Sequence, residues 1–93
     1  MNKYEVLYII SQDVTEEKRE AIINSFADIV TKNGGTVDKI DKLGLKKFAY
    51  EIKGKKEGFY VLMYFTADSN VPSLIEQKMA LTDGFVRKMF RKI

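Results

Sequence analysis

The first third of the chain changes from a strand-like to a helix-like hydrophobic pattern. Residues 4–10 are rich in β-branched and aromatic side chains and end at a polar turn, which predicts a strand. Beyond Thr15, a residue type that caps helices well, apolar residues recur at spacings of three and four, which predicts an amphipathic helix. Gly34 and Gly35 are expected to end this helix, because glycine adopts the left-handed conformation without a steric penalty.

The middle of the chain is extended and is interrupted by glycines. Residues 36–53 predict one long strand, and Gly44 within it predicts a bulge that bends the strand. Residues 53–58 contain two glycines and predict a hairpin loop. Residues 59–65 alternate again and predict a third strand.

The last third predicts a short helix and a final strand. Pro72 suits the first turn of a helix, and a turn at residues 82–84 precedes an extended stretch over residues 85–92. The apolar stripe of this helix is expected to contain Leu74, Ile75 and Met79, with Leu81 near its end.

The resulting β-α-β-β-α-β order has one favoured solution. Two split, right-handed crossovers give an α+β, ferredoxin-like sandwich, in which a four-stranded antiparallel sheet carries both helices on one face. The first and third strands are then central. We expect residues 1–93 to form this single domain.

Both faces of the two central strands are apolar, which a sheet covered on one side does not require. One set must face the helices, and the other is then available as a docking face for protein or nucleic acid. The alternative is that long polar side chains from the edge strands cover the second set. We assign to this outer, partner-binding set Leu7, Ile9, Tyr60, Leu62 and Tyr64.

The amino-acid composition excludes most kinds of enzyme catalysis. The chain has no Cys and no His, so it lacks thiolate nucleophiles, imidazole bases and the usual ligands of zinc, copper and haem. Its paired carboxylates lie beside lysines, an arrangement typical of solvated surface, and no serine has a histidine to activate it. We therefore expect no enzymatic activity, no metal and no cofactor.

The net charge of +3 hides a strong segregation of charge. Residues 38–57 carry seven basic and four acidic side chains, and residues 87–93 carry four basic and no acidic ones. Such blocks indicate a polyanionic partner, although a solvated face is the commoner cause of a single charge run. Strand alternation predicts that Arg87 and Arg91 point to one face and Lys88 and Lys92 to the other, which suits phosphate contacts along a sheet edge.

The basic blocks supply the candidate nucleic-acid contacts. They are Lys46, Lys47, Lys53, Lys55, Lys56, Arg87, Lys88, Arg91 and Lys92.

Other activities of the same fold fit the sequence poorly. An acylphosphatase-like enzyme needs a cationic phosphate cradle after the first strand, and this loop carries Asp13. A metal-transfer domain needs CxxC there, and the chain has no Cys. The stretch from Glu57 to Tyr64 resembles the third strand of an RNA-recognition motif for two positions and then departs from it.

Several motifs together resemble one family over the whole chain. The most specific is the run Leu-Gly-Leu-Lys-Lys-Phe-Ala-Tyr at 43–50, and the others are Tyr4-Glu5-Val6, Gly34-Gly35, Gly58-Phe59-Tyr60 and Val86-Arg87-Lys88-Met89. These residues resemble the family of the sixth protein of the bacterial small ribosomal subunit, ribosomal protein S-six.

This resemblance implies a structural protein that binds the central domain of the small-subunit ribosomal RNA. It implies a heterodimer with the eighteenth small-subunit protein, a role in assembly and translation, and a monomer when isolated. The family's basic residues match Lys46-Lys47, Arg87 and Lys92, and Lys3 matches one of two basic residues near the N-terminus. Asn2 departs from the other.

Two further interpretations stay open at this point. One is a homo-oligomeric interaction domain that pairs through its apolar sheet face and binds no RNA. The other is a free-standing RNA-recognition module. The first eleven residues are too short and too polar for a signal peptide, and no apolar run is long enough to span a membrane, so we expect a cytoplasmic protein.

Overall fold

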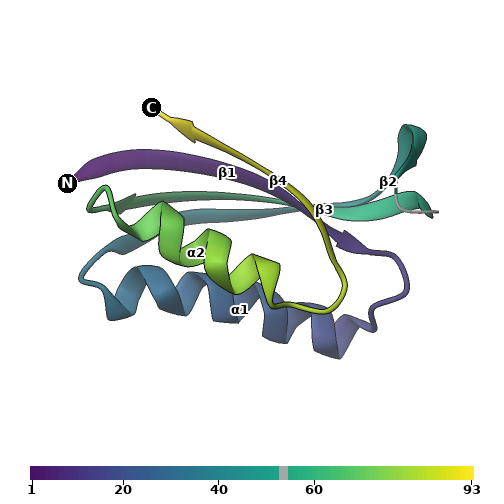
Figure 1. Ribbon diagram of the computed structural model, residues 1–93, viewed down its shortest axis with the longest axis horizontal. Helices are drawn as coiled ribbons and strands as arrows, with labels where there is room; N and C mark the ends of the chain where they lie inside the picture. The colour runs from purple at the N-terminus through teal and green to yellow at the C-terminus, as the bar shows by residue number, and fades with distance from the viewer. Residues whose placement is uncertain (53–54) are drawn as a thin grey trace.

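The computed structural model describes residues 1–52 and 55–93, with side chains described outside 49–55. The strand order in the sheet is β2-β3-β1-β4, with antiparallel neighbours throughout. Both helices pack against one face of the sheet and leave the other face uncovered (Figure 1). The elements are β1 (Asn2–Ser11), α1 (Glu16–Lys32), β2 (Thr36–Ile52), β3 (Lys55–Ala67), α2 (Val71–Ala80) and β4 (Phe85–Lys92). The predicted ferredoxin-like fold is confirmed, with the first and third strands central.

Both ends of α1 follow from local sequence. Thr15 is the N-cap, and its hydroxyl oxygen accepts a 3.3 Å hydrogen bond from a backbone N–H three residues later. At the other end, Gly35 N–H donates to the Val30 carbonyl (2.9 Å) and Gly34 N–H donates to the Thr31 carbonyl (3.2 Å). These two bonds form a Schellman motif, which requires the positive φ of +79° that Gly34 adopts. The predicted helix limits are confirmed.

The second strand is long and bent, as predicted. Its register with β3 shifts between Val37 and Lys39 and again between Lys42 and Gly44. Gly44 has a φ of +93°, a backbone conformation that other residues rarely adopt. The bend carries the far end of β2 away from the plane of the sheet (Figure 1).

The predicted hairpin loop at residues 53–58 is too long, and this prediction is wrong. Lys55 already begins β3, and Glu57 and Gly58 pair with Lys47 and Lys46 of β2. Gly58 is a packing glycine rather than a turn glycine, because a Cβ there would lie 2.4 Å from a methyl carbon of Ile9. Close approach of side chains, not turn geometry, explains this glycine.

The hydrophobic core fills the space between the sheet and the helices. The ring of Tyr8 packs edge-on against Phe26, with their centroids 5.1 Å apart. Leu81, expected near the helix stripe, is instead 84% exposed, because it is the C-cap of α2 and lies beyond the buried face. Side chains with no exposed area in this core include Val6, Tyr8, Ile10, Phe26, Val30, Val61, Met63, Phe65, Val71 and Ile75. Among the described residues, neither helix has the length and apolar character needed to cross a membrane.

Candidate interaction surfaces

The uncovered face of the sheet, called here the open face, carries all the residues assigned to the outer set. Tyr4, Val6, Tyr8 and Ile10 point into the core, so the alternate residues of β1 point outward. Cross-strand pairing places Leu7 opposite Leu62 and Ile9 opposite Tyr60, while Tyr64 lies opposite Glu5. The structure therefore brings Leu7, Ile9, Tyr60, Leu62 and Tyr64 together in one apolar strip across the two central strands.

Two residues that the sequence analysis missed extend this strip. Phe48, on the bent part of β2, lies with its ring centroid 6.2 Å from that of Tyr60 and covers the Gly58 position beside Ile9. Ile9 is consequently only 7% exposed although it points away from the helices. On the other side, Met89 of β4 pairs with Leu7 and is 67% exposed. The alternation of β4 carried a signal for Met89, and Phe48 lies in the same alternation phase as Thr36 and Lys46 because the two register shifts before it cancel.

The basic residues of β4 divide between the two faces as predicted. Arg87 pairs with Ile9 and Arg91 with Glu5, so both belong to the open face. Arg91 also forms an ion pair with the Glu5 carboxylate at 2.9 Å. The remaining two cations pair with tyrosines whose side chains face the core, and they therefore point to the helix side of the edge; they are Lys88 and Lys92.

The lysines of β2 line the opposite edge of the sheet. Lys46 pairs with Gly58 on the open-face side, and Lys47 pairs with Glu57 and points the other way. Lys42 reaches the helix layer, where its ammonium group forms an ion pair with the Glu20 carboxylate. Lys46 and Lys47 are both exposed, so this pair straddles the edge.

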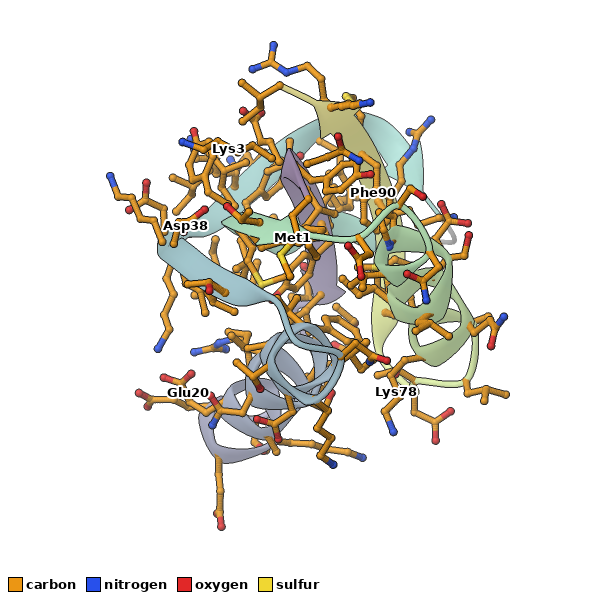
Figure 2. All side chains as sticks on the ribbon, turned by 90° about the vertical axis from the view of Figure 1, so that its left-hand side faces the viewer. Met1, Lys3, Glu20, Asp38, Lys78 and Phe90 are labelled. Atoms are coloured by element: carbon orange, nitrogen blue, oxygen red, sulfur yellow. The ribbon has the colours of Figure 1, made fainter. Side chains whose placement is uncertain are left out.

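The remaining predicted RNA contacts have different outcomes. Lys56 is exposed and lies within β3. Lys3 is exposed at the start of β1, on the side of the sheet away from the helix residues Glu20 and Lys78 (Figure 2). Lys53 and the side chain of Lys55 lie outside the described residues. The predicted cations thus do not form one patch, because β2 and β4 are the two opposite edges of the sheet.

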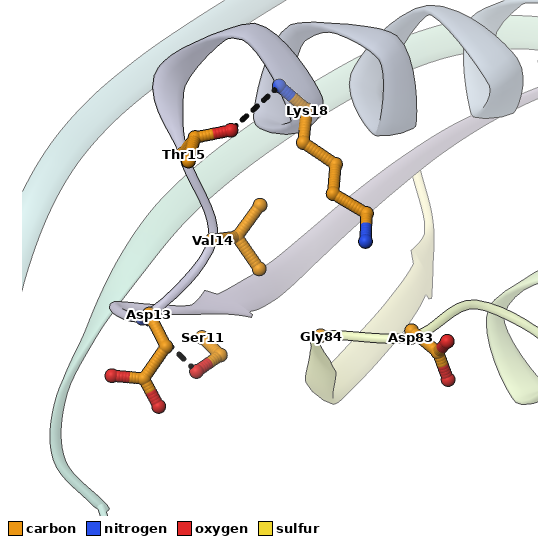
Figure 3. Close-up of a pocket in the computed structure, with 7 residues that line it drawn as sticks. All are labelled: Ser11, Asp13, Val14, Thr15, Lys18, Asp83 and Gly84. Atoms are coloured by element: carbon orange, nitrogen blue, oxygen red, sulfur yellow. Dashed lines mark hydrogen bonds between the residues drawn. The ribbon is translucent and has the colours of Figure 1, made fainter.

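The loop after β1 offers no cationic cradle of the acylphosphatase kind. A pocket of about 390 Å³ lies there, and its lining includes the acidic residues Asp13 and Asp83 and the base Lys18 (Figure 3). The Asp13 N–H donates to the Ser11 hydroxyl at 3.3 Å, and the Ser11 N–H donates to the Gly84 carbonyl at 2.6 Å. These backbone donors are used within the protein, so they do not converge on an anion.

Tyr8 is a titratable group that is completely buried in the core. Tyr8 has no exposed area, and its hydroxyl has no hydrogen-bond partner among the described residues. Burial raises the pKa of this phenol well above its usual range, and the nearby negative charge of Glu20 raises it further. A phenol held neutral in this way has no role in acid–base chemistry near pH 7. No group of three or more His, Cys, Asp or Glu residues suited to a metal occurs in the described part of the chain.

The fold and surface define a ferredoxin-like binding protein with an apolar sheet face between two basic edges. Residues 3–92 match the family model described as Ribosomal protein S6, and the chain therefore belongs to this family. The resemblance drawn from the sequence motifs is confirmed.

Individual relatives agree over almost their full length. The chain is 46% identical to small ribosomal subunit protein bS6 of Exiguobacterium sibiricum over 92 residues, which cover 99% of this chain and 97% of the relative. It is 42% identical to the bS6 protein of Thermoanaerobacter pseudethanolicus over 87 residues, covering 94% and 92%. The crystal structure of 30S ribosomal protein S6 from Thermotoga maritima superposes with a TM-score of 0.93 at 32% identity, covering 99% and 87%.

Family membership fixes the general role. The chain is a protein of the small ribosomal subunit, and an RNA-binding role in translation follows from its family. The predicted location, the cytoplasmic ribosome, is confirmed on the same basis.

Proposed function

We propose that this protein binds the central domain of the small-subunit ribosomal RNA jointly with the eighteenth small-subunit protein, with which it forms a heterodimer. Its role is to hold this RNA and this neighbour in place during subunit assembly, without catalysis. The observation that carries the proposal is the open face, where an apolar strip lies between two edges rich in lysine and arginine.

The apolar strip supports a protein partner. Leu7, Leu62 and Tyr64 keep part of their surface accessible, and Met89 adds a largely exposed side chain. A contiguous apolar surface of this kind marks an interaction site in soluble proteins. Burial against a second protein would remove it from water without disturbing the core on the other face.

The basic edges support RNA contacts at two separate places. Lys46 and Lys47 of β2 supply one edge, with Lys56 on the adjoining part of β3, and Lys88 and Lys92 of β4 supply the other. Lysine ammonium groups bind phosphate oxygens as point charges and position a protein on RNA without reading bases. RNA contacts at both edges leave the strip between them free for the protein partner.

A filter-binding titration with a central-domain rRNA fragment tests the joint binding. We expect weak binding by this protein alone, tighter binding when the eighteenth protein is present, and a steep loss of affinity with rising salt. Equal affinity with and without the partner would contradict the cooperative part of the proposal. Light scattering of the isolated chain should give a monomer, and a stable homodimer without RNA affinity would favour a homo-oligomeric domain instead.

Charge reversal locates the RNA contacts. The double variant Lys88→Glu, Lys92→Glu should lose at least about tenfold in RNA affinity, because two phosphate contacts become repulsive. Lys18→Glu provides a control, since this exposed lysine lies on α1 and on neither edge strand. Circular dichroism should be unchanged in both variants. Wild-type RNA affinity in the double variant would remove this edge from the proposed site.

A further inference from the structure

The open face has a depression between the neighbouring strands β1 and β4. A pocket of about 60 Å³ opens between β1 and β4, lined by Leu7, Ile9, Arg87 and Met89 of the open face and by Lys88, whose side chain points to the other face. Ile9 is 7% exposed, whereas Met89 is 67% exposed. The pocket is therefore a depression in the apolar surface of the open face.

We propose that this pocket receives one aliphatic side chain of the protein partner, and that Arg87 at its rim binds a carboxylate next to that side chain. The inference rests on the proposed heterodimer, and it names the chemistry by which the partner is recognised. It also moves Arg87 from the candidate RNA contacts to the protein interface.

The size of the pocket fits a small apolar group. One water-sized group needs about 10–15 Å³ of such space, so about 60 Å³ holds roughly four of them and matches the branched end of a valine or leucine side chain better than an aromatic ring. Leu7, Ile9 and Met89 are all aliphatic or thioether side chains and offer no hydrogen bond to a polar guest. An aliphatic side chain therefore loses no hydrogen bond when it enters the pocket.

The same lining disfavours RNA as the occupant. Proteins that hold unpaired bases stack them on aromatic rings, and this pocket contains none. The tyrosines of the open face, Tyr60 and Tyr64, lie on β3, on the other side of β1. A phosphate would meet the cations of β4 but would also bring its charge against three apolar side chains, which do not solvate it.

The positive charge of Arg87 at the rim of the pocket favours an acidic residue next to the partner's aliphatic side chain. The two arginines of β4 share the open face, but among the described side chains only Arg91 has a carboxylate partner, in Glu5. Arg87 is exposed and makes no ion pair with any residue that the structure describes. A guanidinium group can bind a carboxylate through two parallel hydrogen bonds, and arginine is enriched among the residues that dominate protein interfaces.

Isothermal titration calorimetry with the purified eighteenth small-subunit protein, without RNA, tests the pocket. Arg87→Glu should weaken binding by at least about 30-fold, as expected for loss of a central arginine contact. Met89→Asp places a charge in the pocket wall and should weaken binding by at least about tenfold, while Met89→Leu should stay close to wild type. Lys32→Glu is the control, because Lys32 is an exposed cation in the last turn of α1 and does not line the pocket.

The outcomes separate this inference from the proposed heterodimer. If the wild-type chain fails to bind the eighteenth protein, the proposed function itself is wrong. If the wild type binds and Arg87→Glu and Met89→Asp bind equally well, only the pocket assignment is wrong. If Arg87→Glu keeps its protein affinity but loses affinity for the rRNA fragment, Arg87 is an RNA contact. We expect unchanged melting temperatures for these variants, because Arg87 and Met89 are exposed. Such a result would exclude misfolding as the cause of weaker binding.

Discussion

The two faces of the sheet are built from the same strands, yet they perform different tasks. On the helix face, Val6, Val61 and Met63 have no exposed area. On the open face, their direct neighbours Leu7 and Leu62 are similarly apolar but only partly buried. The helices, and not the hydrophobicity of the strands, decide which apolar set becomes the core.

This difference shows how a small domain can hold a core and an apolar docking surface in one sheet. Side chains of successive residues point to opposite faces, so a change on one face leaves the other almost untouched. The core lies between the sheet and the helices α1 and α2, so we expect its stability to depend little on what covers the open face. Substitutions at adjacent positions can therefore separate folding from binding.

The sharpest test uses two neighbours on β3. Met63→Ala should lower the free energy of unfolding by about 2–5 kcal/mol, because it leaves a cavity in a fully buried site. Leu62→Ala should lower it by about 1 kcal/mol or less, since the leucine already contacts water. Urea unfolding followed by circular dichroism measures both. Equal losses would mean that the open face belongs to the core in solution.

Partner binding should show the reverse order for this pair. Leu62→Ala removes apolar surface from the proposed interface, so affinity for the eighteenth protein should fall although the fold is kept. Met63→Ala should retain near wild-type affinity at temperatures where the protein stays folded. A stronger binding defect in Met63→Ala would reverse the assignment of the two faces.

Much of the fold could be predicted because its signals are local. Thr15 and Gly34 mark the ends of α1, and both act through hydrogen bonds within a few residues. Strict alternation in β1 and β3 separated the two apolar sets. The division of the β4 cations between two faces followed from the same period of two.

The remaining features depend on contacts between distant segments. The face of Phe48 depends on how many register shifts precede it in β2, because one shift moves every later side chain to the other face and the second moves them back. Gly58 was interpreted as a turn residue because its closest neighbours, Ile9 and Phe48, are remote in sequence. The pocket beside Arg87 likewise needs the relative height of side chains on two strands, which the sequence does not encode locally.

The helix face, as far as the structure describes it, has an unsatisfied hydroxyl at Tyr8, and removing it sharpens the contrast with the open face. Tyr8→Phe deletes a buried hydroxyl that has no hydrogen-bond partner in the described part of the chain, and the edge-on packing against Phe26 is kept. We expect a gain of up to about 1 kcal/mol in the free energy of unfolding, because an unsatisfied polar group no longer has to be buried. Urea unfolding near neutral pH measures this gain. A clear loss of stability would mean that the hydroxyl does form a hydrogen bond in solution.

The same residue predicts a dependence on alkaline pH. Burial raises the pKa of Tyr8 in the folded state, so the unfolded chain releases this proton first as pH rises past about 10. The folded state then binds more protons than the unfolded state, and stability falls with further increase in pH. Comparing unfolding at about pH 9 and about pH 11, we expect a smaller fall for Tyr8→Phe than for wild type. Identical falls would exclude Tyr8 as a source.

The smallest effect is expected from the ion pair at the edge of the open face. Glu5→Gln removes the charge opposite Arg91, whose side chain is 70% exposed, so the loss of stability should be about 0.5 kcal/mol or less. High salt should reduce this difference, because it screens exposed charges. Affinity for the eighteenth protein should change little, since the proposed contact is Arg87 and not Arg91. A large loss of affinity in Glu5→Gln would place the centre of the interface at the Glu5–Arg91 pair instead of at the pocket.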